Sequence, residues 1–107
     1  MTFEEIVAKV RATFKNADVS GIKEHLAYQF DITGEGAGAF YAEVKDGKLS
    51  IEPYEYYDRD ATFICKAETL LKIMDGKMDP VMAFTMQKLK VEGDLGKALR
   101  LKEIISK

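Results

Sequence analysis

The sequence predicts a single α+β domain, residues 1–107, in which helices cover one face of a β-sheet. The chain of 107 residues has the length of one domain, and dividing it would leave neither half an adequate core. Its hydrophobic pattern repeats with a helical period at the N-terminus and changes to a period of two from residue 26. Three consecutive strands are then followed by a mixture of helices and strands, which is typical of α+β layers.

A capping box begins the predicted N-terminal helix. Thr2 and Glu5 have the spacing at which the threonine side chain caps the helix and the glutamate side chain bonds back to the cap residue. Apolar residues then recur every three or four positions, with charged residues between them. We therefore expect an amphipathic helix over residues 2–15.

Five later segments have the composition and alternation of β-strands. They are residues 26–33, 40–45, 48–52, 61–66 and 88–92. Asp46-Gly47 connects the second and third segments and predicts a type I′ hairpin turn, which needs positive φ at both positions. Pro53 ends the third segment, because proline cannot donate a hydrogen bond to a strand partner.

Three helices are expected in the second half of the chain, over residues 68–75, 80–86 and 95–105. Gly76 is placed to cap the C-terminus of the first. Asp79-Pro80 starts the second, because aspartate caps a helix and proline loses no hydrogen bond at the first helical position. Asp94 caps the last helix, which we expect to act as a lid because little beyond its apolar face constrains it.

Composition and charge exclude several classes of protein. The formal net charge is −2, whereas nucleic-acid-binding domains are basic. No apolar run reaches the ~20 residues of a membrane span. Cys65 is the only cysteine, so neither a disulfide framework nor a cysteine metal cluster is expected. With no signal peptide and no Ser-Lys-Leu peroxisomal address, we expect a cytoplasmic protein. No cofactor or metal is expected, and a monomer is favoured although the sequence does not determine the oligomeric state.

Isolated reactive residues do not assemble into a catalytic motif. His25 is the only histidine and lacks a local metal-ligand partner, so we place it on the surface at the start of the first strand. Cys65 lies in an apolar strand and is interpreted as a core residue. Asp58 and Asp60 lie in a charged loop and are interpreted as solvated. The glycines in residues 34–38 match no phosphate-binding motif and are assigned to a turn.

Methionine and basic residues are unevenly distributed. Met74, Met78, Met82 and Met86 fall in one stretch, where they fit either core packing or an adaptable ligand surface. Residues 88–107 hold six basic and three acidic side chains. That imbalance fits either a solvated helix face or transient contact with an anionic membrane.

Several segments resemble the sterol carrier protein 2 (SCP-2) domain family. Residues 30–36, Phe-Asp-Ile-Thr-Gly-Glu-Gly, are similar to the family's first strand and turn, and residues 40–41 with the hairpin 45–48 follow in the family's order. Residues 77–84 are similar to its Gly-Lys-x-x-Pro helix start. The most characteristic segment is residues 88–94, Lys-Leu-Lys-Val-Glu-Gly-Asp. The resemblance extends over essentially the whole chain.

The resemblance implies a five-stranded, mostly antiparallel sheet covered by helices, enclosing an apolar tunnel for fatty acid, fatty acyl-CoA, sterol or isoprenoid. Carried over by position, the expected lipid-binding residues are Phe30, Met82, Met86, Leu99, Leu101, Ile104 and Ile105. The expected function is non-enzymatic binding and transfer or presentation of lipid. Two alternatives stay open: an accessory module for a lipid-metabolising partner enzyme, and an acyl-CoA thioesterase that uses Cys65, His25 or a carboxylate.

Overall fold

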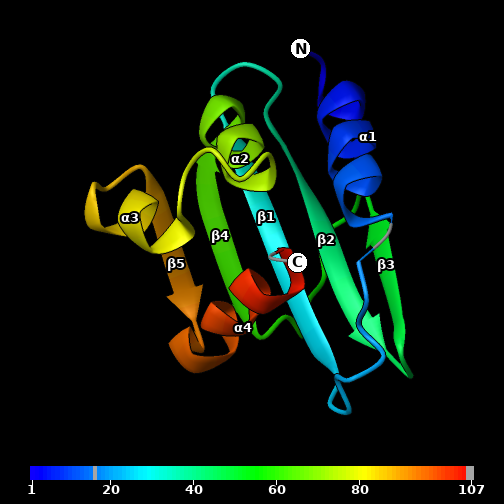
Figure 1. The fold of residues 1–107 in the computed structure, drawn as a ribbon. Coiled ribbons are helices and arrows are strands. Elements are labelled where there is room, and N and C mark those ends of the chain that lie inside the picture. Colours follow the sequence, from blue (N-terminus) through cyan, green and yellow to red (C-terminus); the bar gives the residue numbers. More distant parts are fainter. Residues whose placement is uncertain (16, 106–107) are drawn as a thin grey trace.

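The described residues form one five-stranded sheet and four helices, which is the α+β architecture that the sequence predicts (Figure 1). The computed structural model describes residues 1–15 and 17–105, and the side chains of residues 103 and 105 lie outside that description. No helix in the described part of the chain is long and apolar enough to cross a membrane. The elements are, in order, α1 (Phe3–Phe14), β1 (Leu26–Thr33), β2 (Gly38–Lys45), β3 (Lys48–Glu52), β4 (Ala61–Lys66), α2 (Ala67–Met74), α3 (Pro80–Thr85), β5 (Leu89–Gly93) and α4 (Leu95–Ile105).

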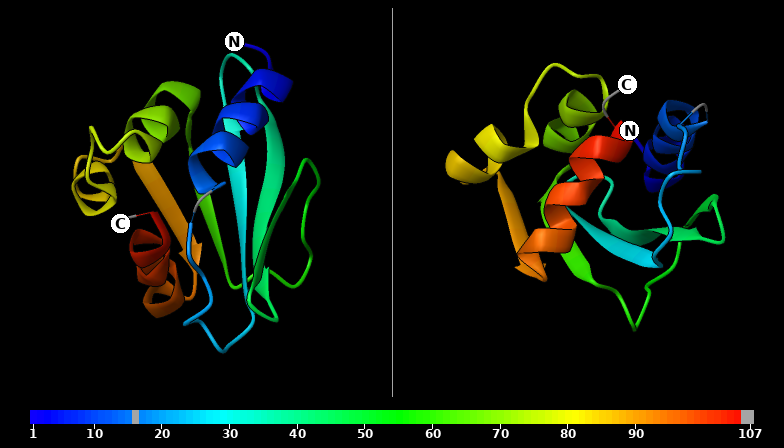
Figure 2. Two further views of the ribbon diagram at one scale, coloured as in Figure 1. Left: turned by 45° about the vertical axis from the view of Figure 1, so that its right-hand side comes forward. Right: turned by 60° about the horizontal axis from the view of Figure 1, so that its bottom comes forward.

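The strands lie in the order β3-β2-β1-β4-β5. β1, β2 and β3 form an antiparallel meander, β4 joins the other side of β1 in parallel, and β5 returns antiparallel to β4. α1, α2 and α4 cover one face, and α3 lies beside the β5 edge (Figures 1 and 2). The predicted sheet, mostly antiparallel and covered by helices on one face, is therefore confirmed.

Local sequence signals set the ends of several elements where predicted. The Glu5 N–H donates to Thr2 Oγ1 at 3.2 Å, and the Thr2 N–H donates to Glu5 Oε1 at 2.8 Å, which completes the capping box of α1. Asp46 and Gly47 have φ values of 53° and 76°, as a type I′ turn requires. Asp79 is the N-cap of α3 and accepts hydrogen bonds from its first turn.

A row of aromatic rings crosses the helix-covered face of the sheet. Phe30 of β1 is paired in register with Phe40 of β2 and with Phe63 of β4. Its ring centroid lies 4.8 Å from that of Phe40 and 5.2 Å from that of Phe63, and both pairs are stacked. Val91 of β5 is paired with Phe63 and extends the row to the sheet edge. Because side chains alternate between the two faces of a strand, this row forms the centre of the core.

Residues 53–60 close part of the opposite face, where Tyr56 fastens them. The Tyr56 N–H donates to Gln29 Oε1 at 3.0 Å, and its hydroxyl donates to Glu43 Oε2 at 2.7 Å. His25 Nε2 lies 2.6 Å from the same Glu43 oxygen and is partly exposed, at the surface position that the sequence predicts. The hydrogen bonds from Tyr56 and His25 hold the pKa of Glu43 below its ordinary value, and the Glu43 carboxylate raises the pKa of Tyr56 to about 12.

Candidate functional site

An apolar cleft of about 270 Å³ lies between α3, β5 and α4. Its floor is formed by Phe63 of β4 with Leu89 and Val91 of β5. Since Phe63 and Val91 are register partners, the floor continues the aromatic row of the core. The walls come from the two helices: Pro80, Val81 and Phe84 of α3, and Leu95, Ala98, Leu99 and Leu101 of α4.

α3 is a short helix that one buried side chain and its terminal contacts hold in place. Ala83 is completely buried, and its carbonyl accepts the Lys88 N–H at 2.9 Å. Gln87 has a φ of 62°, which turns the chain from α3 towards β5. Val81 and Phe84 line the cleft but remain about half exposed. The cleft is therefore open to solvent at this point, and the enclosed tunnel stays a prediction.

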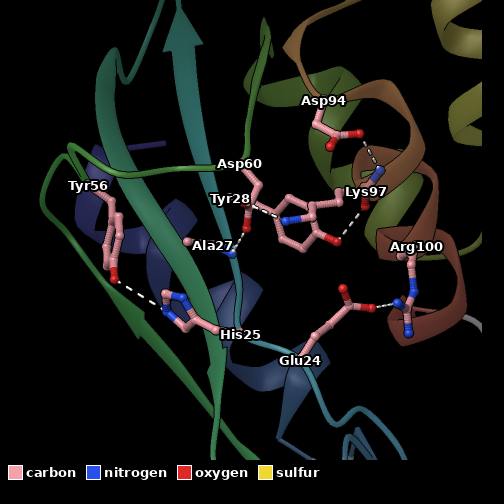
Figure 3. Close-up of polar contacts among 9 residues, drawn as sticks. All are labelled: Glu24, His25, Ala27, Tyr28, Tyr56, Asp60, Asp94, Lys97 and Arg100. Atoms are coloured by element: carbon pink, nitrogen blue, oxygen red, sulfur yellow. Dashed lines mark hydrogen bonds and ion pairs between the residues drawn. The ribbon is translucent and has the colours of Figure 1, made fainter.

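The start of α4 is fixed by polar contacts to β1 and to Asp60, the residue before β4 (Figure 3). Gly93 has a φ of 99°, and a β-carbon there would come within 2.6 Å of the Asp60 carbonyl oxygen. The Asp94 N–H donates to that oxygen at 2.9 Å, and Asp94 Oδ1 caps α4 by accepting the Lys97 N–H. The Tyr28 hydroxyl donates to the Lys97 carbonyl at 2.6 Å. These contacts set the height of the α4 wall above the sheet.

The interpretation of Asp60 as a solvated loop residue is wrong. Its side chain is one-fifth exposed and accepts the Ala27 N–H at 2.8 Å and Lys97 Nζ at 3.1 Å (Figure 3). These partners are 33 and 37 residues away, so no local pattern could indicate them. Asp58, in contrast, is exposed as predicted. A second polar attachment of α4 is the ion pair between Arg100 and Glu24.

Lys102 is the one charged side chain among the described residues that line the cleft. Its Nζ lies 2.9 Å from Asp79 Oδ2, so an ion pair joins α4 to the start of α3 at the rim. The hydrogen bond with Lys102, followed by that from the Val81 N–H, holds the pKa of Asp79 below its ordinary value. Both charged side chains are nearly half exposed, and exposed pairs of this kind are weak enough to open for another anion.

The structure places the predicted lipid-binding residues in different surroundings. Leu99 and Leu101 line the cleft. Phe30 is buried behind the ring of Phe63 and does not reach the lining. Met82 and Met86 are more than half exposed and also lie outside the lining.

The remaining predicted residues belong to the end of α4. Ile104 is buried in the core, and the side chain of Ile105 lies outside the described residues. The cleft residues that the sequence analysis did not assign to a site lie on α3, α4, β5 and β4. The alternation of Leu89 and Val91 does indicate their inward face, but it gives no sign that α3 leaves a gap above them.

Neither Cys65 nor His25 lines the cleft, and none of the described lining residues carries a carboxylate, so the groups of the thioesterase alternative lie outside it. Cys65 is buried in β4, and burial raises the pKa of its thiol to about 11, which opposes formation of the reactive thiolate. His25 belongs to the cluster with Glu43 and Tyr56 at the opposite face of the sheet. The two side chains therefore belong to different parts of the structure, and the ionisable group that the cleft does present is Lys102.

Comparison with known proteins identifies the family. A model described as the SCP-2 sterol transfer family matches residues 4–106. The chain belongs to this family. The resemblance found in the sequence is thereby confirmed, and membership assigns the chain to lipid binding and transfer in the broad sense.

Relatives of this SCP-2 family chain include much longer proteins. Hydroxysteroid dehydrogenase-like protein 2 of Xenopus tropicalis is 37% identical over 79 residues, which cover 73% of this chain and 19% of that protein. Sterol carrier protein 2 of Bos taurus is 35% identical over 74 residues, which cover 69% of this chain and 14% of that protein. The chain thus spans less than a fifth of the length of either relative.

A solved SCP-2 structure has the same fold. The solution structure of palmitated SCP2L2 from Aedes aegypti matches with a TM-score of 0.72 at 22% identity, and the match covers 100% of this chain and 96% of that one. At this level of identity the likeness concerns the fold, which accords with the sheet and helices described above.

Proposed function

We propose that this chain binds a single-chain lipid with an anionic head group, such as a fatty acid or fatty acyl-CoA, and carries or presents it unchanged. The observation that carries this proposal is the composition of the cleft, whose lining is apolar apart from Lys102 at the rim. An acyl chain removes the apolar lining from water, and a carboxylate or phosphate replaces Asp79 beside Lys102. A sterol or an isoprenoid alcohol offers no anionic group and would leave Lys102 paired with Asp79.

The size of the cleft favours a short acyl chain in the structure as it stands. Its 270 Å³ lies just below the ~300 Å³ of the smallest ligand pockets. If a methylene group occupies about the volume of a water molecule, ~30 Å³, the cleft holds roughly nine of them. A longer chain requires α3 and α4 to separate, and opening of the Lys102–Asp79 pair permits that movement.

A binding role without catalysis accords with the chemistry of the lining. Thioester hydrolysis needs a nucleophile or an activated water beside the bound ligand. The described lining offers a lysine amine at the rim, while Cys65 is buried in β4 with a raised pKa. A bound acyl group therefore meets hydrocarbon side chains along its length.

Calorimetric titration with decanoate and with decanol tests the proposal. We expect both to bind, with decanoate favoured, and Lys102→Gln to lower the affinity for decanoate about fivefold while leaving decanol unchanged. Lys90→Gln is the matched control, because Lys90 is exposed on β5 and does not line the cleft. Failure of both probes to bind would remove the lipid-binding assignment of this cleft. Equal affinities of Lys102→Gln and Lys90→Gln for decanoate would refute the proposal that the ligand has an anionic head group.

Presentation of lipid to a partner enzyme is a second candidate. It is favoured by the relatives, because this chain corresponds to 19% of hydroxysteroid dehydrogenase-like protein 2 from Xenopus tropicalis and that protein therefore has further chain beside the shared region. At a fixed total lipid concentration, the loaded chain should raise the rate of a lipid-metabolising enzyme from the same organism. An unchanged rate would refute presentation to that enzyme and leave lipid carriage as the proposed function.

A further inference from the structure

The two edge strands of the sheet are covered differently. On β3, the guanidinium of Arg11 donates to the Ile51 carbonyl from Nε at 3.0 Å and from Nη2 at 2.9 Å, so a side chain of α1 covers this edge. β5 is the last strand at the other edge, and no backbone hydrogen bond among the described residues joins it to any segment except β4. Figure 1 shows α3 beside the first half of β5 only. An unpaired edge of this kind is a template for another strand.

The pairing with β4 determines which backbone groups of β5 face the open side. The Asp94 N–H donates to the Asp60 carbonyl, and the β4–β5 register continued by one residue places these two opposite each other. Hydrogen-bonded and non-hydrogen-bonded pairs alternate along antiparallel strands, so Glu92 and Lys90 also bond towards β4. The N–H and carbonyl of Val91, which lies between them, therefore point away from the sheet.

The side chains of β5 carry opposite charges on the bare face of the sheet. Lys90 and Glu92 are exposed, and neither has an ion-pair partner among the described residues. Val91 lies in the cleft floor, so its two neighbours point away from the helices. An antiparallel copy centred on Val91 places each lysine opposite the glutamate of the other copy. Centring on Lys90 or on Glu92 would instead bring like charges together, so the charges select one register.

We propose that β5 pairs with β5 of a second copy, antiparallel about Val91, so that two five-stranded sheets become one continuous sheet. The two Val91 residues exchange N–H···O bonds across the two-fold axis, and Leu89 of each copy lies opposite Gly93 of the other. Lys90 and Glu92 form two identical ion pairs on the bare face. The chain is then a dimer, which departs from the monomer that the sequence favours.

The same pairing covers apolar surface at the two ends of β5. Phe84 of α3 and Leu95 of α4 are 48% and 54% exposed. Because α3 precedes β5 and α4 follows it, antiparallel pairing brings α3 of one copy beside the start of α4 of the other. Contact between these side chains of opposite copies removes apolar area from water and adds to the affinity of the edge. The pairing itself requires no lipid in the cleft.

Sedimentation equilibrium over a range of protein concentrations tests the pairing. The wild type should show a reversible monomer–dimer equilibrium. Lys90→Glu sets two carboxylates opposite each other at both ends of the strand, and should weaken dimerisation about tenfold or more, as should Glu92→Lys. The two substitutions together exchange the charges and should restore association. Lys48→Glu is the matched control, because Lys48 is an exposed lysine of the other edge strand, and should leave dimerisation unchanged.

Amide hydrogen exchange reports the backbone bonds separately. The Val91 N–H has no backbone acceptor among the described residues of its own chain, so its exchange should slow as protein concentration is raised. The Leu49 N–H is the comparison, since it faces the open side of β3 as the Ile51 carbonyl does, and its exchange should not depend on concentration. Lys90→Glu should remove the concentration dependence at Val91.

The outcomes separate strand pairing from lipid binding. A wild type that stays monomeric at millimolar concentration, or a dimer that Lys90→Glu and Lys48→Glu weaken equally, would overturn the proposal. Failure of the charge exchange to restore association would overturn the register about Val91. Decanoate titration of Lys90→Glu should match the wild type, because Lys90 does not line the cleft, so each proposal can fail without the other.

Discussion

The two ends of one sheet face are packed in opposite ways. At the α1 end, Ile6 and Val10 are fully buried against strands whose inward side chains, such as Phe40 and Val44, are also fully buried. At the β5 end, Phe84 and Leu99 remain about half exposed on the helices above the sheet. The same layer of helices therefore seals one end of the core and leaves a cleft at the other.

This difference in packing assigns folding stability and ligand binding to different parts of the sheet face. Burial of apolar area at the α1 end supplies free energy of folding, which leaves the β5 end free to keep apolar surface available for a ligand. α4 can form one wall of an open cleft because Asp60 fixes its first turn through Lys97, and Ile104 anchors its last turn in the core. Substitutions at the two ends should consequently affect different measurements.

The largest expected effect comes from Phe30→Ala at the centre of the buried aromatic row. The change removes a ring that is stacked between two others, so we expect unfolding to require about 3–5 kcal/mol less free energy. Leu99→Ala at the open end should change stability by no more than about 0.5 kcal/mol, because the side chain is already exposed. Urea denaturation of both variants checks this, and decanoate titration of Leu99→Ala should show a severalfold weaker affinity. Equal losses of stability would contradict the distinction between the sealed core and the open cleft.

An intermediate effect is expected for Gly93→Ala. This variant tests whether the close contact at Gly93 positions the start of α4. Gly93 combines a positive φ with a close approach to the Asp60 carbonyl, so we expect a loss of about 2–3 kcal/mol and weaker decanoate binding as the start of α4 shifts. Gly47→Ala is the comparison, because Gly47 also has a positive φ, of 76°, but no heavy atom lies within 4 Å of the added carbon. Its loss should be about 1 kcal/mol, with unchanged decanoate binding. Thermal denaturation and calorimetry distinguish the two variants.

The smallest effect is expected for Tyr56→Phe on the opposite face, which serves as a reference for both ends. Losing the hydroxyl contact with Glu43 should cost about 1 kcal/mol at pH 7 and leave decanoate binding unchanged. The contact lowers the pKa of Glu43, so its contribution is complete above the ordinary glutamate pKa of 4.5 and is lost as pH falls through the lowered value. The stability difference from wild type, followed by urea denaturation, should therefore shrink below about pH 4. A stability difference that grows in acid would show that the Tyr56 hydroxyl does not stabilise the ionised form of Glu43.

Local patterns in the sequence predicted the elements of this fold well. The Thr2–Glu5 capping box and the Asp46-Gly47 turn depend on residues only a few positions apart, so their conformations can be read before any tertiary contact is known. Alternation likewise identified the inward side chains of β1, including Phe30. The family resemblance then supplied the five-stranded sheet that local patterns cannot specify.

The site was less accessible to sequence reasoning, because it depends on distances between elements. Periodicity places Met82 on a helix, but the gap between α3 and α4 decides whether that side chain lines a cleft or faces solvent. Phe30 points inward as predicted, yet Phe63, which is brought beside it by the parallel β1–β4 pairing, separates it from the cleft. Asp60 acquires its role from partners more than 30 residues away.

The crossover between β3 and β4 also implies an order of assembly. β1, β2 and β3 pair through tight turns, whereas β4 reaches β1 only after residues 53–60 have crossed the sheet, and β5 returns only after residues 67–88. The entropy of loop closure rises with loop length, so the meander is the faster nucleus and β4, β5 and α4 condense onto the edge of β1 afterwards. We therefore expect the half of the chain that contains the cleft to fold last and to open with the least disturbance of the rest.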